Sequence, residues 1–275
     1  MAATSGDVRI SVVTGGALGI GGATSRRLAA DGDHVVLLDI DGDAAHRTAD
    51  AIRTAGGTAT VVVGDATVDA DLDRLAEAAS AIDDGRVDVL VNNVGDFRPA
   101  KAIFLRSSAD QWEAMHRINL RHVFATTFRF APAMIARGQG VIVNVSTVEA
   151  FRGIPGHAVY SAYKAGVAAF TKSMAVELGP SGVRVVGVAP DLTDTEQTPR
   201  AAMLRDRDPE LIRSWLPIGR FGLPEDAADV IAFLASGDAR FVTGTTIPVD
   251  GGTLAASGWY GRTSARGWTN MPDGT

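Results

Sequence analysis

Short apolar runs alternate with longer amphipathic stretches along most of the chain. The apolar runs are rich in valine and are bounded by Gly, Asp or Asn, which is typical of buried strands. The predicted strands are residues 10–13, 35–38, 60–63, 87–91, 141–145, 184–188 and 246–249. The predicted helices are residues 20–30, 43–55, 69–82, 109–137, 160–178 and 224–236. This alternation predicts an α/β fold, with a seven-stranded parallel sheet that is doubly wound and flanked by helices.

Two segments interrupt the alternation. Residues 191–223 contain charges and prolines but no predicted strand, and we expect two short helices there, in an insertion that covers a site as a lid. The tail, residues 254–275, carries Trp259, Tyr260 and Trp268, and we expect it to pack on a neighbouring surface. No linker composition or internal repeat divides the chain, so we expect residues 1–275 to form a single domain.

The composition excludes several kinds of chemistry. The 275 residues contain no cysteine, so disulfides, thiolate catalysis and cysteine-bound metals are ruled out. A net charge of −6 leaves no excess of Lys and Arg for a nucleic-acid partner. The sequence shows neither a signal peptide nor an apolar run near the roughly 20 residues of a membrane helix, so we expect a cytoplasmic protein without a membrane partner.

A glycine-rich turn joins the first predicted strand to the first helix. Residues 14–21 read Thr-Gly-Gly-Ala-Leu-Gly-Ile-Gly, and glycines there let backbone N–H groups approach a pyrophosphate at a helix N-terminus. The second strand ends at Asp39, 18 residues beyond Gly21, where a carboxylate can bind the ribose hydroxyls of an adenine dinucleotide. Together the two features predict a dinucleotide-binding Rossmann domain rather than a plain strand–helix connection.

Tyr160 and Lys164 stand four residues apart in a predicted helix, so their side chains share a face. A tyrosine hydroxyl acts as a base near neutral pH only if its pKa falls from about 10 to about 7. This shift requires roughly 4 kcal/mol. An exposed Tyr–Lys pair supplies at most about 1 kcal/mol. We therefore expect the pair to be partly desolvated, with the positive ring of an oxidised cofactor contributing the rest. Tyr163 faces away from Lys164, and we predict a core or interface role for it.

Four motifs, in this order, resemble those of the short-chain dehydrogenase/reductase family. They are the turn at 14–21, Asn-Asn-Val-Gly at 92–95, Tyr-x-x-x-Lys at 160–164 and the stretch 220–252. The resemblance covers roughly residues 7–253. It implies a compact oxidoreductase that acts without metal and moves a hydride between NAD and a secondary alcohol or ketone. It also implies a homotetramer, paired through the helices near 109–137 and 160–178 and through the strand near Val249.

The resemblance assigns roles to individual residues. Tyr160 is the acid/base, Lys164 orients the ribose and lowers the Tyr160 pKa, and Asn119 holds a water relay to the lysine. The hydroxyl that holds the substrate oxygen stands 13 residues before the tyrosine, which selects Thr147, with Ser146 as the alternative if the register shifts. The cofactor-binding residues are Gly15, Leu18, Gly19, Ile20, Gly21, Asp39, Ile40, Asp65, Ala66, Asn92, Gly95, Tyr160, Lys164, Pro190, Leu192 and Thr195.

Asp39 also predicts the choice of cofactor. A carboxylate about 5 Å from a 2′-phosphate costs around 3 kcal/mol per charge at an effective dielectric constant of 20. Neither Leu18 nor Ile40, the neighbouring positions, supplies a cation for that phosphate. The sequence therefore predicts NAD rather than NADP.

Several candidates for the substrate site depart from the family pattern. Asp191 replaces the family's glycine after Pro190, and Asp96 and Glu149 also stand where small or apolar residues are usual. Carboxylates in a pocket suit a polyhydroxylated or cationic substrate, unless these residues face solvent on loop rims. Further candidates to line the pocket are Phe97, Phe151, His157 and Trp215, with a solvated loop as the alternative for His157. The five histidines are too scattered to predict a metal site.

Two other functions stay open as alternatives. The first is a non-catalytic dinucleotide-binding regulatory protein on the same scaffold, against which the intact Tyr160, Lys164, Asn119 and glycine turn argue. The second is a dehalogenase or epimerase on a related scaffold. Halohydrin-type relatives lose the dinucleotide turn and replace the lysine by arginine, and neither change is present here.

Overall fold

The computed structural model describes residues 8–83, 85–100, 102–204, 208–258, 260–261 and 268–269. Its centre is a parallel sheet of seven strands in the order β3-β2-β1-β4-β5-β6-β7. The strands are β1 (Ile10–Thr14), β2 (His34–Asp39), β3 (Thr58–Val63), β4 (Val89–Asn92), β5 (Gly140–Val145), β6 (Val183–Pro190) and β7 (Thr246–Val249). This confirms the predicted sheet, and each strand matches its predicted bounds to within two residues.

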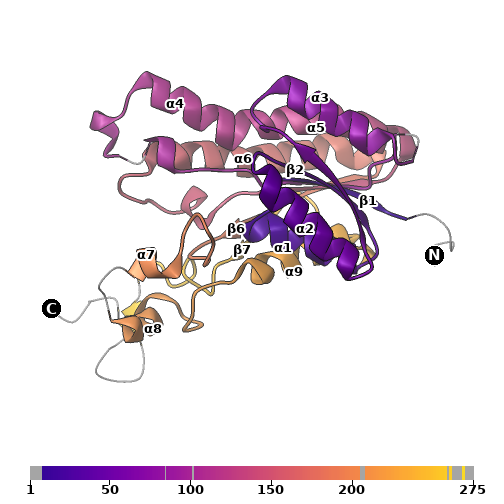
Figure 1. The fold of residues 1–275 in the computed structure, drawn as a ribbon. Coiled ribbons are helices and arrows are strands. Elements are labelled where there is room, and N and C mark those ends of the chain that lie inside the picture. Colours follow the sequence, from indigo (N-terminus) through magenta and orange to yellow (C-terminus); the bar gives the residue numbers. More distant parts are fainter. Residues whose placement is uncertain are drawn as a thin grey trace.

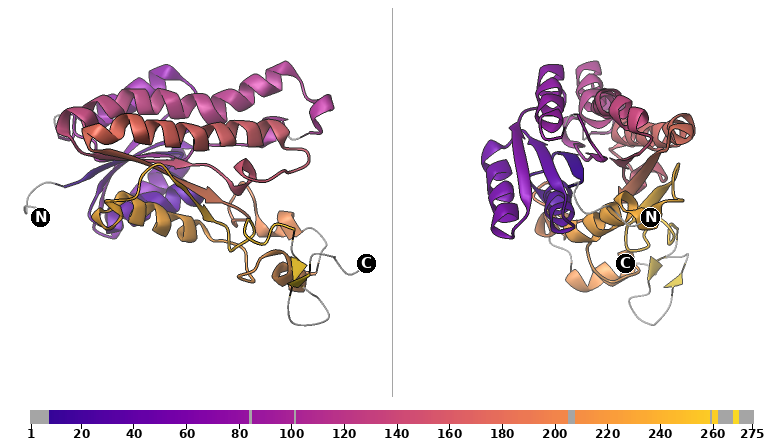
Figure 2. Two further views of the ribbon diagram at one scale, coloured as in Figure 1. Left: turned by 180° about the vertical axis from the view of Figure 1, so that it is seen from behind. Right: turned by 90° about the vertical axis from the view of Figure 1, so that its right-hand side faces the viewer.

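Helices cover both faces of the sheet (Figures 1 and 2). One face carries α1 (Gly19–Ala30), α2 (Gly42–Thr54) and α9 (Pro224–Ala235), and the other carries α3 (Asp69–Ser80), α4 (Ala109–His116), α5 (His122–Arg137) and α6 (Ala158–Leu178). Each face has its own buried cluster, with Leu28 and Ile52 in the first and Leu75 and Met134 in the second. Because both faces are covered, the strands are nearly continuous apolar runs rather than alternating ones. No helix in the described part of the chain is long and apolar enough to cross a membrane.

One helix prediction was wrong in detail. Residues 109–137 were expected to form one helix, but a π-helical turn, Arg117–Arg121, separates α4 from α5. Asn119 lies in the middle of this turn, and its Nδ2 donates to the carbonyls of Met115 at 3.0 Å and Asp96 at 2.8 Å. An insertion of this kind re-aims one side chain without ending the helix, and it is common at functional sites.

The segment 191–223 leaves the sheet and lies beyond the carboxyl ends of the strands (Figure 1). It contains α7 (Arg200–Leu204) and α8 (Ile212–Trp215), which are the two short helices expected there. Its buried side chains Leu204, Ile212, Leu216 and Phe221 form a small cluster of their own. The segment is therefore packed together rather than extended over the surface.

Two short strands follow in the tail, β8 (Tyr260–Gly261) and β9 (Trp268–Thr269), which pair antiparallel. Trp259 and the side chains of Tyr260 and Trp268 lie outside the described residues, so the packing of the tail aromatics stays a prediction.

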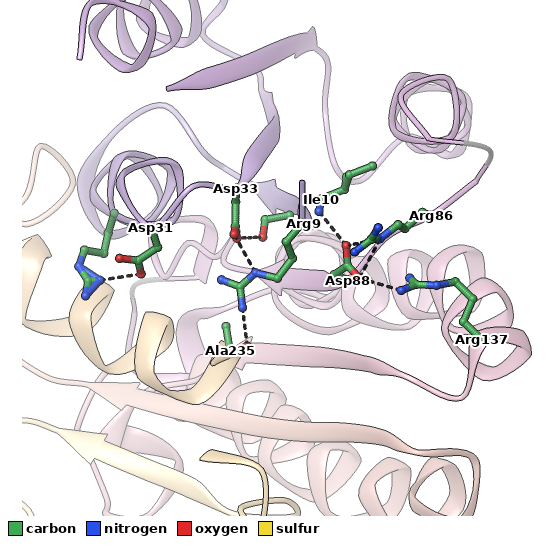
Figure 3. Close-up of polar contacts among 10 residues, drawn as sticks. Arg9, Ile10, Asp31, Asp33, Arg86, Asp88, Arg137 and Ala235 are labelled. Atoms are coloured by element: carbon green, nitrogen blue, oxygen red, sulfur yellow. Dashed lines mark hydrogen bonds and ion pairs between the residues drawn. The ribbon is translucent and has the colours of Figure 1, made fainter. Parts of the chain in front are cut away.

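Two buried carboxylates stabilise the end of the sheet at which the strands begin, opposite to segment 191–223 (Figure 3). Asp33 pairs with Arg9 at 2.7 Å. Asp88 accepts the backbone N–H of Ile10 at 2.8 Å and pairs with Arg86 and Arg137, each at 2.9 Å. Because charges in the interior are costly unless paired, these contacts hold the start of β1 and the segment before β4 in register.

Candidate active site

A cleft of about 910 Å³ opens where the strands end. The loops after β1, β2, β3, β4, β5 and β6 all contribute to its lining, and segment 191–223 closes one side. The strand order reverses between β1 and β4, and ligands of open α/β sheets bind in the crevice at such a point. The volume lies in the range of pockets that hold cofactors and small molecules.

The glycine turn after β1 forms one end of the cleft. Gly15 and Gly19 have positive φ angles of +64° and +51°, which side chains rarely adopt. A Cβ at Gly21 would lie 1.9 Å from the carbonyl oxygen of Gly15, so only glycine lets α1 begin against the turn. Of the predicted cofactor-binding residues of this turn, Gly15, Leu18, Gly19 and Ile20 line the cleft, and Gly21 does not.

Asp39 stands at the carboxyl end of β2 on the rim of the same cleft. One carboxylate oxygen accepts the N–H of Ala17 at 3.0 Å and the other accepts the N–H of Asp41 at 3.1 Å. These bonds hold the carboxylate beside the glycine turn. Ile40 and Leu18 flank it with exposed apolar side chains. Other predicted cofactor positions that line the cleft are Asp65, Ala66, Gly95, Pro190, Leu192 and Thr195.

The structure does not bring Asn92 to the cleft. Its side chain is buried, accepts the Thr126 hydroxyl at 2.6 Å and donates to Asn144 at 2.9 Å. Asn93 lines the cleft instead, and its Nδ2 donates to the Gly15 carbonyl at 3.1 Å. Successive residues at the end of a strand point in opposite directions, so this strand period is the signal that separates the two asparagines.

Lys164 is buried beneath the cleft on α6. Its Nζ donates to the carbonyl oxygen of Val145 at 2.9 Å, and burial lowers its pKa to about 8. A Cβ at Gly95 would lie 2.7 Å from this Nζ, so the glycine after the asparagine pair makes room for the lysine. The desolvation expected of the Tyr160–Lys164 pair is present at Lys164.

Tyr160 lines the cleft one turn before Lys164. Burial and the Glu149 carboxylate raise the pKa of Tyr160 above its usual value, and the nearby Thr147 hydroxyl, which lowers this pKa, offsets only part of the rise. At neutral pH Tyr160 is therefore protonated. The lowering of this pKa by Lys164 together with the positive ring of an oxidised cofactor stays a prediction.

The two neighbouring hydroxyls after β5 point in different directions. Thr147 Oγ1 lies beside Tyr160 and donates to the Pro190 carbonyl at 3.3 Å. Ser146 Oγ donates to the Lys164 carbonyl at 2.9 Å and so anchors the backbone of α6. The geometry favours Thr147 over Ser146 as the group beside the reacting oxygen.

Asn119 joins the π-helical turn to the loop after β4. Besides the bond from its Nδ2 to the Asp96 carbonyl, its Oδ1 accepts the Asp96 N–H at 3.1 Å. A Cβ at Gly95 would lie 3.2 Å from this Oδ1 and close to Lys164 Nζ as well, so asparagine and lysine approach the same glycine. The water relay assigned to Asn119 stays a prediction.

The candidates for the substrate site divide into two groups. Asp96, Phe97, Glu149, His157 and Asp191 line the cleft. Phe151 and Trp215 do not line it.

Phe151 is 43% exposed on the loop outside the cleft, and Trp215 packs beside the small cluster of segment 191–223. Tyr163 also stays outside, with its ring 5.4 Å from that of His116. Gln197 was not anticipated: it lines the cleft, and its Nε2 donates to the Gly95 carbonyl at 3.2 Å. No sequence signal marks Gln197, because the bond joins segments 102 residues apart.

Comparison with known proteins agrees with this geometry. A family model described as enoyl-(acyl carrier protein) reductase matches residues 15–253. The chain is 38% identical to 3-oxoacyl-(acyl-carrier-protein) reductase FabG of Thermotoga maritima, over 90% of this chain and 98% of that protein. It is 41% identical to cis-4-hydroxycyclohexanecarboxylate dehydrogenase of Sinomonas cyclohexanicum, over 90% of this chain and 97% of that protein.

Solved structures show the same fold. Levodione reductase superimposes with a TM-score of 0.83 at 32% identity, and a variant of actinorhodin polyketide ketoreductase with NADPH superimposes with a TM-score of 0.83 at 30% identity. Each comparison covers 90% of this chain and 98% of the other. With this fold, this cleft and these relatives, the chain belongs to the short-chain dehydrogenase/reductase family and is an oxidoreductase.

Proposed function

We propose that this protein is an NAD(H)-dependent oxidoreductase that interconverts a secondary alcohol and a ketone, with Tyr160 as its acid/base. The observation that carries the proposal is the convergence of three groups in one cleft. The Tyr160 hydroxyl and Thr147 Oγ1 lie close together there, Lys164 is buried beside them, and the glycine turn opens into the same space.

The residues around the cleft fit a dinucleotide. The glycine turn and the start of α1 suit the pyrophosphate, Asp39 suits the adenosine ribose, and Leu192 with Thr195 suits the nicotinamide amide. A bound nicotinamide supplies the hydride acceptor or donor.

Tyr160 and Thr147 act on the substrate oxygen. In ketone reduction the protonated Tyr160 donates its proton to the carbonyl oxygen, which the Thr147 hydroxyl holds. In alcohol oxidation Tyr160 accepts the proton, and this direction requires its pKa to fall. The charge of Lys164 stabilises the Tyr160 phenolate and so lowers the Tyr160 pKa. The positive charge of a bound oxidised cofactor would lower this pKa further.

Asp39 supports NAD as the cofactor. The ketoreductase neighbour is described with NADPH, so membership of the family leaves the cofactor open. The Asp39 carboxylate is fixed by two backbone N–H groups and cannot easily withdraw from a 2′-phosphate, which it would repel by about 3 kcal/mol at 5 Å.

The test of cofactor choice is kcat/KM with NAD and with NADP, followed by NADH or NADPH absorbance. We expect a preference for NAD of about 100-fold, which Asp39→Ala weakens. Asp43→Ala, an exposed carboxylate on α2, is the matched control and should leave the ratio unchanged. Equal efficiency with both cofactors in the unaltered protein would contradict the proposal.

The relatives suggest where to look for the substrate. Two of them are named for carbocyclic compounds, cis-4-hydroxycyclohexanecarboxylate and levodione, so cyclic alcohols and ketones are the first panel to assay. Turnover of any compound in this panel supports the proposal that the protein is an enzyme. Tight NAD binding without turnover of any alcohol or ketone would instead favour the regulatory alternative.

A homotetramer is part of the proposal. Helices α5 and α6 expose large apolar side chains, among them Phe124, Phe128 (81% exposed) and Val176 (79% exposed). An exposed apolar surface of this kind is typical of a subunit interface. Light scattering at micromolar concentration is the test, and a monomer would contradict this assembly. Segment 191–223 is proposed to act as the lid of the cleft.

A further inference from the structure

Asp96, Glu149 and Asp191 line the part of the cleft around Tyr160, and the chain neutralises two of them. Arg98 binds both carboxylate oxygens of Asp96, with distances of 2.6–2.9 Å. The Asp191 side chain is only 5% exposed, and its carboxylate accepts a hydrogen bond from Arg152 Nη2 at 2.8 Å and another from the Thr253 hydroxyl. Asp96 and Asp191 are therefore each neutralised by an ion pair within the protein.

Glu149 differs from both. Within the part of the chain that the structure describes, its carboxylate forms no side-chain hydrogen bond and no ion pair. The nearby cation that acts on it, Arg152, is bonded to Asp191. Burial and the Asp191 charge raise the pKa of Glu149 to about 7. This is the behaviour of a carboxylate that has lost water and gained no donor in exchange.

Glu149 is held close to the reacting groups. It lies on the 3₁₀ turn Val148–Ala150, and its backbone N–H donates to Thr147 Oγ1 at 3.4 Å. Its charge raises the pKa of Tyr160, so the carboxylate acts directly on the phenol.

An apolar wall stands in the same part of the cleft. The rings of Phe97, His157 and Tyr160 meet edge to face, with centroids 5.3–6.4 Å apart. The site therefore combines an aromatic wall with one carboxylate, Glu149, that forms no ion pair among the described residues.

We propose that Glu149 determines substrate specificity by accepting a hydrogen bond from a hydroxyl or ammonium group next to the reacting carbon. This rests on the proposed function and narrows its substrate to vicinal diols, amino alcohols and their ketones on an apolar frame. A donor on the substrate restores the hydrogen bond that Glu149 lost on burial, whereas a carboxylate at the same place is repelled.

Asp191 has a part in this arrangement. By binding Arg152 it keeps the arginine from pairing with Glu149, which lies three residues before it. Asp191→Asn releases Arg152, and we expect the preference for donor-bearing substrates to fall. Asp191→Asn combined with Arg152→Gln should restore it. An undiminished preference in Asp191→Asn would contradict the part assigned to Asp191.

The main experiment uses four alcohols that share one ring and differ in one neighbouring group. They are cyclohexanol, 1,2-cyclohexanediol, 2-aminocyclohexanol and 2-hydroxycyclohexanecarboxylate, assayed with NAD at pH 8.5, where Glu149 is ionised. We expect kcat/KM for the diol or the amino alcohol to exceed that of cyclohexanol by about tenfold or more. The carboxylate should fall about tenfold below cyclohexanol. The better of the two donors identifies the group as hydroxyl or ammonium.

Glu149→Gln keeps the shape of the side chain and removes its charge. In this variant the ratios among the four alcohols should collapse to within about threefold. Glu177→Gln, the same change at an exposed position on α6, should keep the original ratios. Equal turnover of all four alcohols by the unaltered protein, or unchanged ratios in Glu149→Gln, would overturn the proposal.

A binding measurement separates this inference from the proposed function. The affinity of each compound for the NADH-saturated protein is measured by isothermal titration calorimetry in the unaltered protein and in Glu149→Gln. Selective binding without turnover would overturn the proposed function and uphold the role of Glu149. Turnover with equal affinities and equal ratios would uphold the enzyme and overturn the role of Glu149.

Discussion

Glu149→Gln should change how the stability of the protein depends on pH. In the folded protein the Glu149 pKa is raised from 4.5 to about 7 by burial and by Asp191. Between these two values the folded state holds a proton that the unfolded state has released, so Glu149 makes stability fall as pH rises through this window. A difference of about 2.5 pKa units corresponds to about 3 kcal/mol. Partial solvent exposure reduces this to about 2 kcal/mol.

The measurement is urea unfolding of the unaltered protein and of Glu149→Gln at pH 5 and at pH 8, at one fixed protein concentration. The variant lacks the titrating group, so its stability relative to the unaltered protein should rise by about 2 kcal/mol from pH 5 to pH 8. Glu177→Gln removes the same charge from an exposed position and should show no such change. A relative stability of Glu149→Gln that is independent of pH, or that falls as pH rises, would refute the reasoning.

The remaining predictions concern catalysis and stability. Tyr160→Phe should abolish turnover while NADH binding, followed by fluorescence, persists; Tyr163→Phe should keep most activity, and equal losses would contradict the assignment. Thr147→Ala should lower kcat about 100-fold, because it removes the hydroxyl that lies beside Tyr160; a larger loss in Ser146→Ala would reverse the choice between them. Asp88→Ala leaves Arg86 and Arg137 without their buried partner and should lower the free energy of unfolding by about 3–5 kcal/mol in urea titrations, and a loss below about 1 kcal/mol would contradict this.

The strand and helix pattern followed from the sequence because local rules govern it. Valine-rich runs of four or five residues bounded by Gly, Asp or Asn are typical of buried strands, and the intervening amphipathic stretches are typical of covering helices. The π-helical turn at 117–121 escaped this reasoning, because it depends on contacts of the Asn119 side chain with a loop 23 residues away. A long-range contact of this kind leaves no periodic signal.

The sequence also determined many of the residues that meet in the cleft, although Asn92, Phe151 and Trp215 lie outside it and Gln197 was missed. The glycine turn, Asp39, Thr147, Tyr160 and Lys164 all line it, because parallel strands bring their carboxyl ends to one edge. The 13-residue spacing to Tyr160 already favoured Thr147 over Ser146. The structure agrees, because the Ser146 hydroxyl is bonded to the Lys164 carbonyl instead. The motif led to Asn92, but side chains alternate at the end of β4, so Asn92 is buried beside Asn144 and Asn93 lines the cleft.

Only the tertiary structure decided how charge is distributed around Tyr160. In the sequence Asp96, Glu149 and Asp191 are three equivalent carboxylates near one pocket. In space Arg98 and Arg152 neutralise the first and the last, and Glu149 is left without a bonded partner among the described residues. The direction of the Tyr160 pKa was set in the same way, since burial and Glu149 outweigh Thr147. Pairing and desolvation depend on distances of a few ångströms between distant segments, and the order of residues along the chain does not specify these distances.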